Sequence, residues 1–301
     1  MRERPSAAGR VLVGGWFSLD DGGATAGDLA ALEVVRTWLD ETGRDHDVAL
    51  APAFGDGVHW RAVRPADYAT LVLVCGPVSP RLATWQLVTR FASCRLVAVD
   101  VSAVDEPEAY GRFAAVVARD GSGEPLPDLA FATSLGRIPV VGVVRVHAQV
   151  EYGERGRHAD VDRLIAEHLA SRPLVTVPVD TQLDANLGGL RDASEVVALI
   201  AKLDAVVTTR LHGLVFALRA GVPAAAVDPV AGGAKVAAQA RAVGWPHVVT
   251  ADALDKDALV QLVDDCLEPS ARALALACAE RARRRIETEV RPRFAASLEP
   301  R

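Results

Sequence analysis

The segment 204–246 constrains the fold more than any other part of the chain. An apolar run ends at Thr209, an amphipathic stretch with helical spacing follows, and a second apolar run covers Ala224–Val227. A strand, a helix and a strand at this spacing predict a parallel βαβ unit. Arg210 and His212 follow directly on the first of these strands. In open α/β sheets ligands bind at the carboxyl ends of the strands, so we expect both side chains at a ligand-binding edge.

Arg210 and His212 suit an anionic ligand, because a guanidinium keeps its charge and an imidazole can carry a proton near neutral pH. We expect a sharp turn at His212-Gly213, where Gly213 lets the backbone approach a ligand. The helix expected to start near Leu214 would direct its positive end to the same place. Lys235 lies in a Gly-rich loop after the next strand. The alternative is a purely structural role, in which Arg210 caps the sheet edge and His212 forms a hydrogen bond with a neighbouring backbone group.

Composition excludes several classes of function. The chain has 301 residues, half of them apolar, with a net charge of −6, which argues against a general nucleic-acid or anionic-membrane binder. Its four cysteines form no C-x-x-C pair, so neither a zinc framework nor a disulfide scaffold is indicated. The N-terminus lacks the apolar core of a signal peptide, and no apolar run spans a bilayer. We therefore expect a cytoplasmic protein without a transmembrane segment.

No metal or organic cofactor is expected either. Gly14-Gly15 lacks the G-x-G-x-x-G spacing of a dinucleotide site. The cluster around His158 and Asp162 opens an expected helix, where acidic residues favour the helix dipole over metal ligation. The sequence thus predicts chemistry carried by side chains alone.

Apolar runs alternate with amphipathic stretches along the rest of the chain, which is typical of α/β proteins. The pattern breaks at a Gly/Pro-rich stretch, 121–127, and then restarts. We predict two Rossmann-like domains with mostly parallel sheets, 1–137 and 138–301, facing each other across a cleft. The expected strands are 10–13, 47–51, 70–75, 95–101, 116–121, 138–146, 174–179 and 205–209, and the expected helices are 29–41 (with Asp28 as N-cap), 81–91, 159–171, 194–202 and 269–290.

Several motifs resemble those of the polysaccharide pyruvyl transferase family. The segment 204–213, DAVVTTRLHG, is followed by Gly221-Val222-Pro223 and Lys235, which resembles an R-x-H-G…G-x-P…K pattern. Val141–Arg145 is similar to the strand that supplies another arginine of the family. The resemblance is strong over about 140–246.

The resemblance is weaker in the first half of the chain. Gly27-Asp28 before an amphipathic helix resembles the second half of an N-x-G-D element. The asparagine of the family is replaced here, with Thr25 and Ala26 preceding Gly27. We therefore expect the donor chemistry to be retained and the acceptor to have diverged.

The resemblance implies a pyruvyl transferase that joins the enol carbon of phosphoenolpyruvate to two hydroxyls of a glycan or other diol as a ketal, releasing phosphate. It also implies a GT-B-like architecture, with the donor in the second domain, the acceptor in the first, and the final helix crossing back to brace the first domain. The implied general acid is His212, and Asp28 would orient or deprotonate an acceptor hydroxyl. The implied donor-binding residues are Arg210, Arg145, Lys235 and Gly213.

Two other functions stay open at the level of sequence. The first is a GT-B glycosyltransferase that uses a nucleotide sugar, with Arg210 and Lys235 holding the diphosphate. The second is a catalytically degenerate homologue that binds an anionic ligand or a partner enzyme. The acceptor and the oligomeric state are not encoded in any pattern that we recognise.

Overall fold

A computed structural model describes residues 9–104, 107–121, 123–146, 150–184, 186 and 188–298. The chain divides into two compact units, Met1–Leu135 (unit 1) and Gly136–Arg301 (unit 2). Residues 1–8, on which the expectation about a signal peptide partly rests, lie outside the described residues. Among the helices that the structure describes, none is both long enough and apolar enough to cross a membrane.

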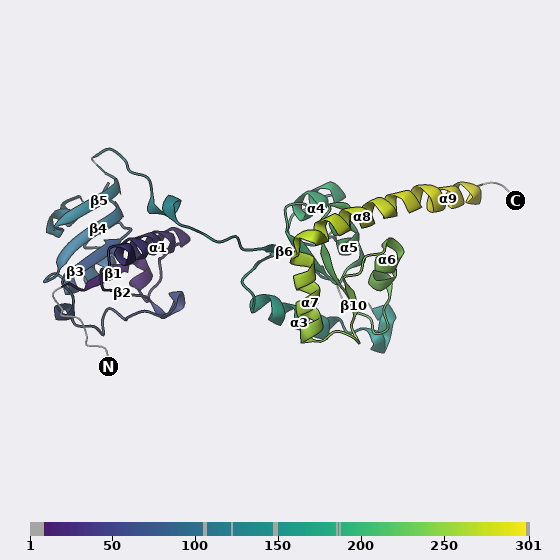
Figure 1. The fold of residues 1–301 in the computed structure, drawn as a ribbon, viewed down its shortest axis with the longest axis horizontal. Coiled ribbons are helices and arrows are strands. Elements are labelled where there is room, and N and C mark those ends of the chain that lie inside the picture. Colours follow the sequence, from purple (N-terminus) through teal and green to yellow (C-terminus); the bar gives the residue numbers. More distant parts are fainter. Residues whose placement is uncertain are drawn as a thin grey trace. The chain divides into compact units, whose positions relative to one another are not determined.

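Unit 1 is built around a five-stranded parallel sheet in the order β2-β1-β3-β4-β5 (Figure 1). Alternate residues of β1 point to opposite faces: Leu12 joins one apolar cluster, and Val11 and Val13 join another. The sheet is therefore buried on both faces, which explains the unbroken apolar runs in the sequence. Its strands are β1 (Val11–Gly15), β2 (His46–Val48), β3 (Thr70–Val74), β4 (Arg95–Ser102) and β5 (Ala115–Asp120).

The helices of unit 1 are α1 (Ala26–Glu41) and α2 (Thr84–Arg90). The expectation that Asp28 caps a helix beginning at residue 29 is wrong, because α1 begins three residues earlier and Thr25 is its N-cap. The backbone N–H of Thr25 donates to Asp28 Oδ2 (2.7 Å), and the N–H of Asp28 donates back to Thr25 Oγ1 (3.3 Å). The two residues form a capping box, a pairing that satisfies two free donors of the first turn.

Unit 2 contains a second five-stranded parallel sheet, in the order β10-β9-β8-β6-β7. The prediction of two Rossmann-like α/β domains with parallel sheets is confirmed, whereas their facing across a cleft stays a prediction. The strands are β6 (Val140–Val144), β7 (Val175–Pro178), β8 (Ala205–Thr208), β9 (Ala224–Asp228) and β10 (Val248–Thr250). The helices are α3 (His158–Ala170), α4 (Ala193–Ile200), α5 (Leu211–Arg219), α6 (Lys235–Val243), α7 (Lys256–Leu267), α8 (Pro269–Arg285) and α9 (Arg291–Ser297).

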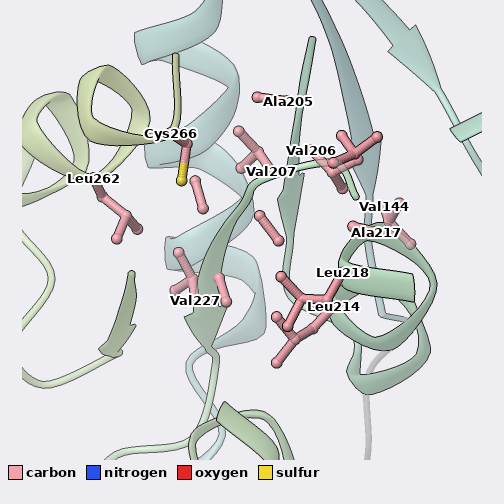
Figure 2. Packing of buried hydrophobic residues seen from close by; sticks show 14 of the residues in the cluster. Val144, Ala205, Val206, Val207, Leu214, Ala217, Leu218, Val227, Leu262 and Cys266 are labelled. Carbon is pink, nitrogen blue, oxygen red and sulfur yellow. The ribbon is translucent and has the colours of Figure 1, made fainter. Parts of the chain in front are cut away.

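The core of unit 2 packs α5 and α7 against the central strands (Figure 2). Leu214 from α5 and Val206 from β8 are fully buried in this cluster. The expected turn at His212-Gly213 is wrong, because α5 already begins at Leu211, with Arg210 as its N-cap. Strand and helix therefore follow each other with almost no loop, and the first turn of α5 lies directly on the end of β8.

Gly213 serves this close packing. It is buried, and a Cβ built there would lie 2.2 Å from Thr208 Oγ1 and 2.9 Å from Val144 Cγ1. Both distances are too short for a real contact, so only glycine lets the first turn of α5 approach the sheet this closely. Gly213 thus has a role in packing, and its expected role in meeting a ligand stays a prediction.

The C-terminal helices leave an apolar stripe in solvent. Helix α8 packs on α5, α6 and α7, and a π-helical turn, Ile286–Val290, then joins it to α9. Ile286, Val290, Phe294 and Leu298 recur at every fourth residue and are all more than half exposed. The idea that this helix crosses back to brace the first domain stays a prediction.

We expect Gly213→Ala to lower the stability of unit 2 by about 1–3 kcal/mol, because the added methyl group overpacks the junction of β8 and α5. Urea unfolding followed by circular dichroism measures the change. Gly136→Ala is the control, since a Cβ at this position meets nothing within 4 Å. Equal stability of the two variants would contradict the packing role.

Candidate functional site

A cavity of about 360 Å³ lies in unit 2 beyond the ends of β8 and β9. Its lining includes Arg210, His212 and Lys235, the three residues that the βαβ segment singled out. They come together because parallel strands end at one edge of the sheet, where the loops that follow them meet. Tyr152 and Asp228 line the same cavity and were not predicted.

Arg210 stands where β8 passes into α5. Its backbone N–H donates to Thr208 Oγ1 (3.0 Å), and its guanidinium contacts Asp180 Oδ1 at 3.4 Å. The Arg210 side chain is only 22% exposed, so the strand end holds it in one place. As the N-cap of α5 it provides no side-chain hydrogen bond to the first turn. The positive end of α5 thus faces the cavity together with a guanidinium, an arrangement that favours an anion.

His212 is the second residue of α5 and is exposed. Its ring stacks on that of Phe216 one turn later, with the centroids 5.9 Å apart and the planes at 26°. The stacking limits the orientations of the imidazole while leaving its edge open to solvent. A ring held in this way can exchange a proton with a ligand in the cavity.

Lys235 is the first residue of α6, beside a segment that precedes α3. Its Nζ lies 3.3 Å from Glu151 Oε1 and 5.4 Å from the centre of the Tyr152 ring. These neighbours raise the pKa of Lys235, the hydrogen bond with Tyr152 contributing most and that with Glu151 next. Lys235 therefore stays charged over the physiological range and already has a counter-ion.

Asp228, at the end of β9, fixes the turn that carries Lys235. Its Oδ1 accepts from the backbone N–H of Val230 (3.1 Å), and its Oδ2 accepts from those of Ala234 (2.7 Å) and Ala237 (2.9 Å). The residue is 1% exposed. Its carboxylate therefore occupies the N-terminus of α6, which leaves the free end of α5 as the more open anion position in the cavity.

Arg145 follows β6 but lines a different cavity, of about 770 Å³, between α3 and β7. Its neighbour Val146 lines the cavity of Arg210, so the end of β6 separates the two hollows. The Arg145 guanidinium lies 4.0 Å from Asp162. Asp180 lines the larger cavity and contacts Arg210, which links the two. The structure thus places Arg145 beside, and not within, the cluster of the other cations.

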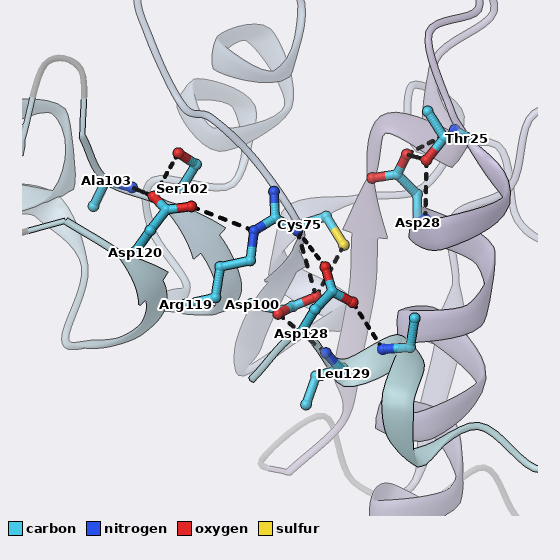
Figure 3. A network of polar contacts seen from close by, with 11 residues as sticks. Thr25, Asp28, Cys75, Asp100, Ser102, Ala103, Arg119, Asp120, Asp128 and Leu129 are labelled. Carbon is cyan, nitrogen blue, oxygen red and sulfur yellow. Dashed lines mark hydrogen bonds and ion pairs between the residues drawn. The ribbon is translucent and has the colours of Figure 1, made fainter. Parts of the chain in front are cut away.

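Asp28 belongs to unit 1 and lies in a polar network at the carboxyl edge of that sheet (Figure 3). Cys75, which follows β3, donates through Sγ to Asp100 Oδ2 at 3.5 Å. Burial, followed by the charges of Asp28 and Asp100, raises the pKa of the Cys75 thiol. Arg119 from β5 closes the network, 3.9 Å from Asp100 and 2.8 Å from Asp128.

Two residues of this network have unusual backbone conformations. Cys75 and Asp100 have φ values of 60° and 56°, in the left-handed region that side chains other than those of glycine, asparagine and aspartate rarely adopt. Burial raises the pKa of Asp100, and the nearby Asp128 adds to the effect. Aspartate adopts this region more readily than cysteine, so the strain lies mainly at Cys75; such strain persists only where the surroundings impose it, and it concentrates at functional sites.

Sequence reasoning missed Tyr152, Asp180 and Asp228. Asp180 and Asp228 each come at or just after a strand end, the same signal that identified Arg210, so this pattern contained them. Tyr152 precedes α3 in a segment without periodicity, and no signal marks it. Among the described residues, no three His, Cys, Asp or Glu side chains are grouped so as to hold a metal ion.

Comparisons with known proteins agree with the prediction of the family. Residues 144–229 match the family model described as polysaccharide pyruvyl transferase, and this match indicates a transferase. The matched range includes Arg145, Arg210 and His212 and ends just after β9. No curated protein matches the chain.

Solved structures with some likeness to the chain include a spinosyn rhamnosyltransferase complexed with spinosyn aglycone, at 11% identity over 85% of this chain and 76% of the other, with a TM-score of 0.34. Another is the UDP-GlcNAc 2-epimerase from Methanocaldococcus jannaschii, at 11% identity over 87% and 93% of the two chains, with a TM-score of 0.33. A third is the glycotransferase of kitacinnamycin, at 12% identity over 91% and 94%, with a TM-score of 0.33. Identities and scores of this size say nothing about substrate.

We expect Asp228→Asn to destabilise unit 2 by about 2–3 kcal/mol, because the amide cannot accept from all three N–H groups and leaves buried donors unpaired. Urea unfolding at pH 7 measures the loss. Asp252→Asn is the matched control, since Asp252 accepts from Gly232 N–H (2.8 Å) of the same turn but lies at the surface. A loss for Asp252→Asn as large as that for Asp228→Asn would contradict this account.

Proposed function

We propose, on the premise of the match to polysaccharide pyruvyl transferases, that the protein transfers pyruvate from phosphoenolpyruvate to a diol of a glycan or related acceptor. The observation that carries the proposal is the convergence of Arg210, His212 and Lys235 on one cavity. Two fixed cations and a helix N-terminus suit a ligand that bears a phosphate and a carboxylate. An imidazole beside them suits a reaction that needs a proton near neutral pH.

In the proposed reaction His212 protonates the methylene carbon of phosphoenolpyruvate, so that C2 becomes an oxocarbenium-like centre. One acceptor hydroxyl attacks C2, and a second then displaces the phosphate to close the ketal. One of the two hydroxyl protons restores the proton that His212 gave to the methylene carbon, and the other leaves with the phosphate, so atoms and charges balance. Arg210 and Lys235 stabilise the phosphate as the C–O bond breaks, which is where their charges lower the barrier.

Arg145 and Asp28 have secondary places in this proposal. Arg145 lies beside the cavity of Arg210 and would extend the binding surface along β6. Asp28 would act on an acceptor hydroxyl from unit 1. Its carboxylate already accepts from Thr25 Oγ1 (2.7 Å). The same carboxylate would therefore both cap the helix and contact the acceptor.

The second candidate is a GT-B glycosyltransferase with a nucleotide-sugar donor, in which the same cations hold a diphosphate. A degenerate homologue that only binds anions is the third. Isothermal titration with phosphoenolpyruvate, UDP and GDP separates them. Micromolar binding of phosphoenolpyruvate alone supports pyruvyl transfer, tight nucleotide binding favours the glycosyltransferase, and silence from all three contradicts both enzymes.

Arg210→Ala should weaken phosphoenolpyruvate binding at least tenfold, because a partly buried charge-assisted contact is lost. Titration calorimetry measures the dissociation constant. Arg219→Ala is the matched control, since Arg219 is an exposed arginine near the other end of α5. Equal effects of the two substitutions would show that Arg210 does not meet the ligand.

His212→Gln should lower turnover by a factor of about 10²–10⁴, the usual contribution of a general acid, while leaving donor affinity within a few fold. Steady-state release of phosphate, with an acceptor found by screening, measures turnover. His247→Gln provides the control. His247 directly precedes β10, which lies on the other side of β9 from β8, the strand that leads to His212. Loss of affinity without loss of turnover would assign His212 to binding.

A further inference from the structure

The cations of the site are already matched by carboxylates of the same unit. Arg210 contacts Asp180 at 3.4 Å, Lys235 contacts Glu151 at 3.3 Å, and Arg145 lies 4.0 Å from Asp162. A ligand anion must therefore compete with an internal one. Among these pairs, that of Lys235 and Glu151 is the most exposed, with each side chain about half in solvent.

Glu151 lies on an anchored segment, 151–157. The backbone N–H of Arg157 donates to the carbonyl of Pro229 (2.8 Å), and that of Ala231 donates to the carbonyl of Arg155 (2.9 Å). Gly156 and Val230 form an antiparallel bridge between these two contacts. The segment is thus tied to the turn that Asp228 holds, the same turn that leads to Lys235.

Glu151 lies four residues before the first of these anchors, and its carboxylate is 3.3 Å from Lys235 Nζ. A tethered group competes at a high effective concentration, so even a weak ion pair shifts the affinity for a free anion. Both partners are exposed and share a single hydrogen bond, so water screens the ion pair and its effect on anion affinity is modest. A modest effect suits a group that must be displaced in each cycle.

We propose that Glu151 is the internal counter-ion that a ligand phosphate displaces from Lys235, and that its return to Lys235 promotes release of inorganic phosphate. The inference rests on the proposed function for its donor and product. It adds that Glu151, which sequence analysis did not single out, sets the affinity of the cavity for phosphate.

The proposal is tested by the affinity of the full chain for inorganic phosphate and for phosphoenolpyruvate, measured by titration calorimetry at constant ionic strength. Glu151→Gln should tighten both about two- to fivefold, the size of a surface ion pair. Glu154→Gln is the matched control, because Glu154 is an exposed carboxylate on the same segment. The effect should also vanish in a Lys235→Ala background, where there is no cation to compete for.

Three results would overturn the inference: no tightening in Glu151→Gln, equal tightening in Glu154→Gln, or tightening that persists without Lys235. Tighter phosphate binding in Glu151→Gln, with phosphoenolpyruvate bound no better than phosphate, would leave the inference standing and contradict the proposed donor. Binding of neither anion to any variant would overturn both. The two proposals therefore fail in different ways.

Discussion

The candidate site depends on one buried carboxylate. Asp228 ends a central strand and accepts from three backbone N–H groups, which fixes the turn after β9 and the start of α6. Lys235 is the first residue of that helix, and the segment carrying Glu151 and Tyr152 is pinned to the same turn. This nearly buried side chain thus positions two parts of the cavity wall. Lys235 can then lie at an exposed helix start without losing its position.

The side chains at the cavity are charged, but their cations and carboxylates largely cancel each other. Arg210 and Lys235 each have a carboxylate within 3.4 Å, and Arg145 beside the cavity lies 4.0 Å from Asp162, so the site does not present a large positive field. The free energy of binding a ligand is then only the difference between the contacts that the ligand makes and the ion pairs that it displaces. Such a site favours exchange of an anion over its tight retention.

Much of the fold was predictable from sequence, because both sheets are parallel and their strands are buried runs. Strands β1 to β9 were predicted near their observed places, with both ends of β3, β4, β5, β7, β8 and β9 within one residue, whereas β10 was not predicted. Helix starts were less well predicted. At α1 the capping box begins with Thr25, a residue set aside as a substitution of a family asparagine, and at α5 the helix begins without the turn that glycine suggested. Both errors come from local chemistry, a side-chain cap and a tertiary contact, that periodicity does not contain.

The site was predicted in part for the same reason. Residues directly after strands were found, since topology alone brings Arg210, His212 and Lys235 together. Arg145 was expected with them, but the end of β6 turns it into the neighbouring cavity, a distinction of side-chain direction that spacing cannot give. Tyr152 and Glu151 lie on a kinked 3-10 segment whose end is held to the turn after β9 by two backbone hydrogen bonds. Nothing in a linear pattern records contacts of that kind.

The left-handed backbone at Cys75 and Asp100 has a consequence for protein engineering. At Cys75 it costs on the order of 1–2 kcal/mol relative to glycine, whereas aspartate tolerates this region more easily. The end of β3 therefore holds a side chain that a search for stability alone would remove. A library selected only for thermal resistance would drift toward glycine at position 75 and would keep Asp100, whose carboxylate accepts from the N–H of Leu129. Survival of Cys75 when activity is also demanded would then show that the chemistry requires its thiol.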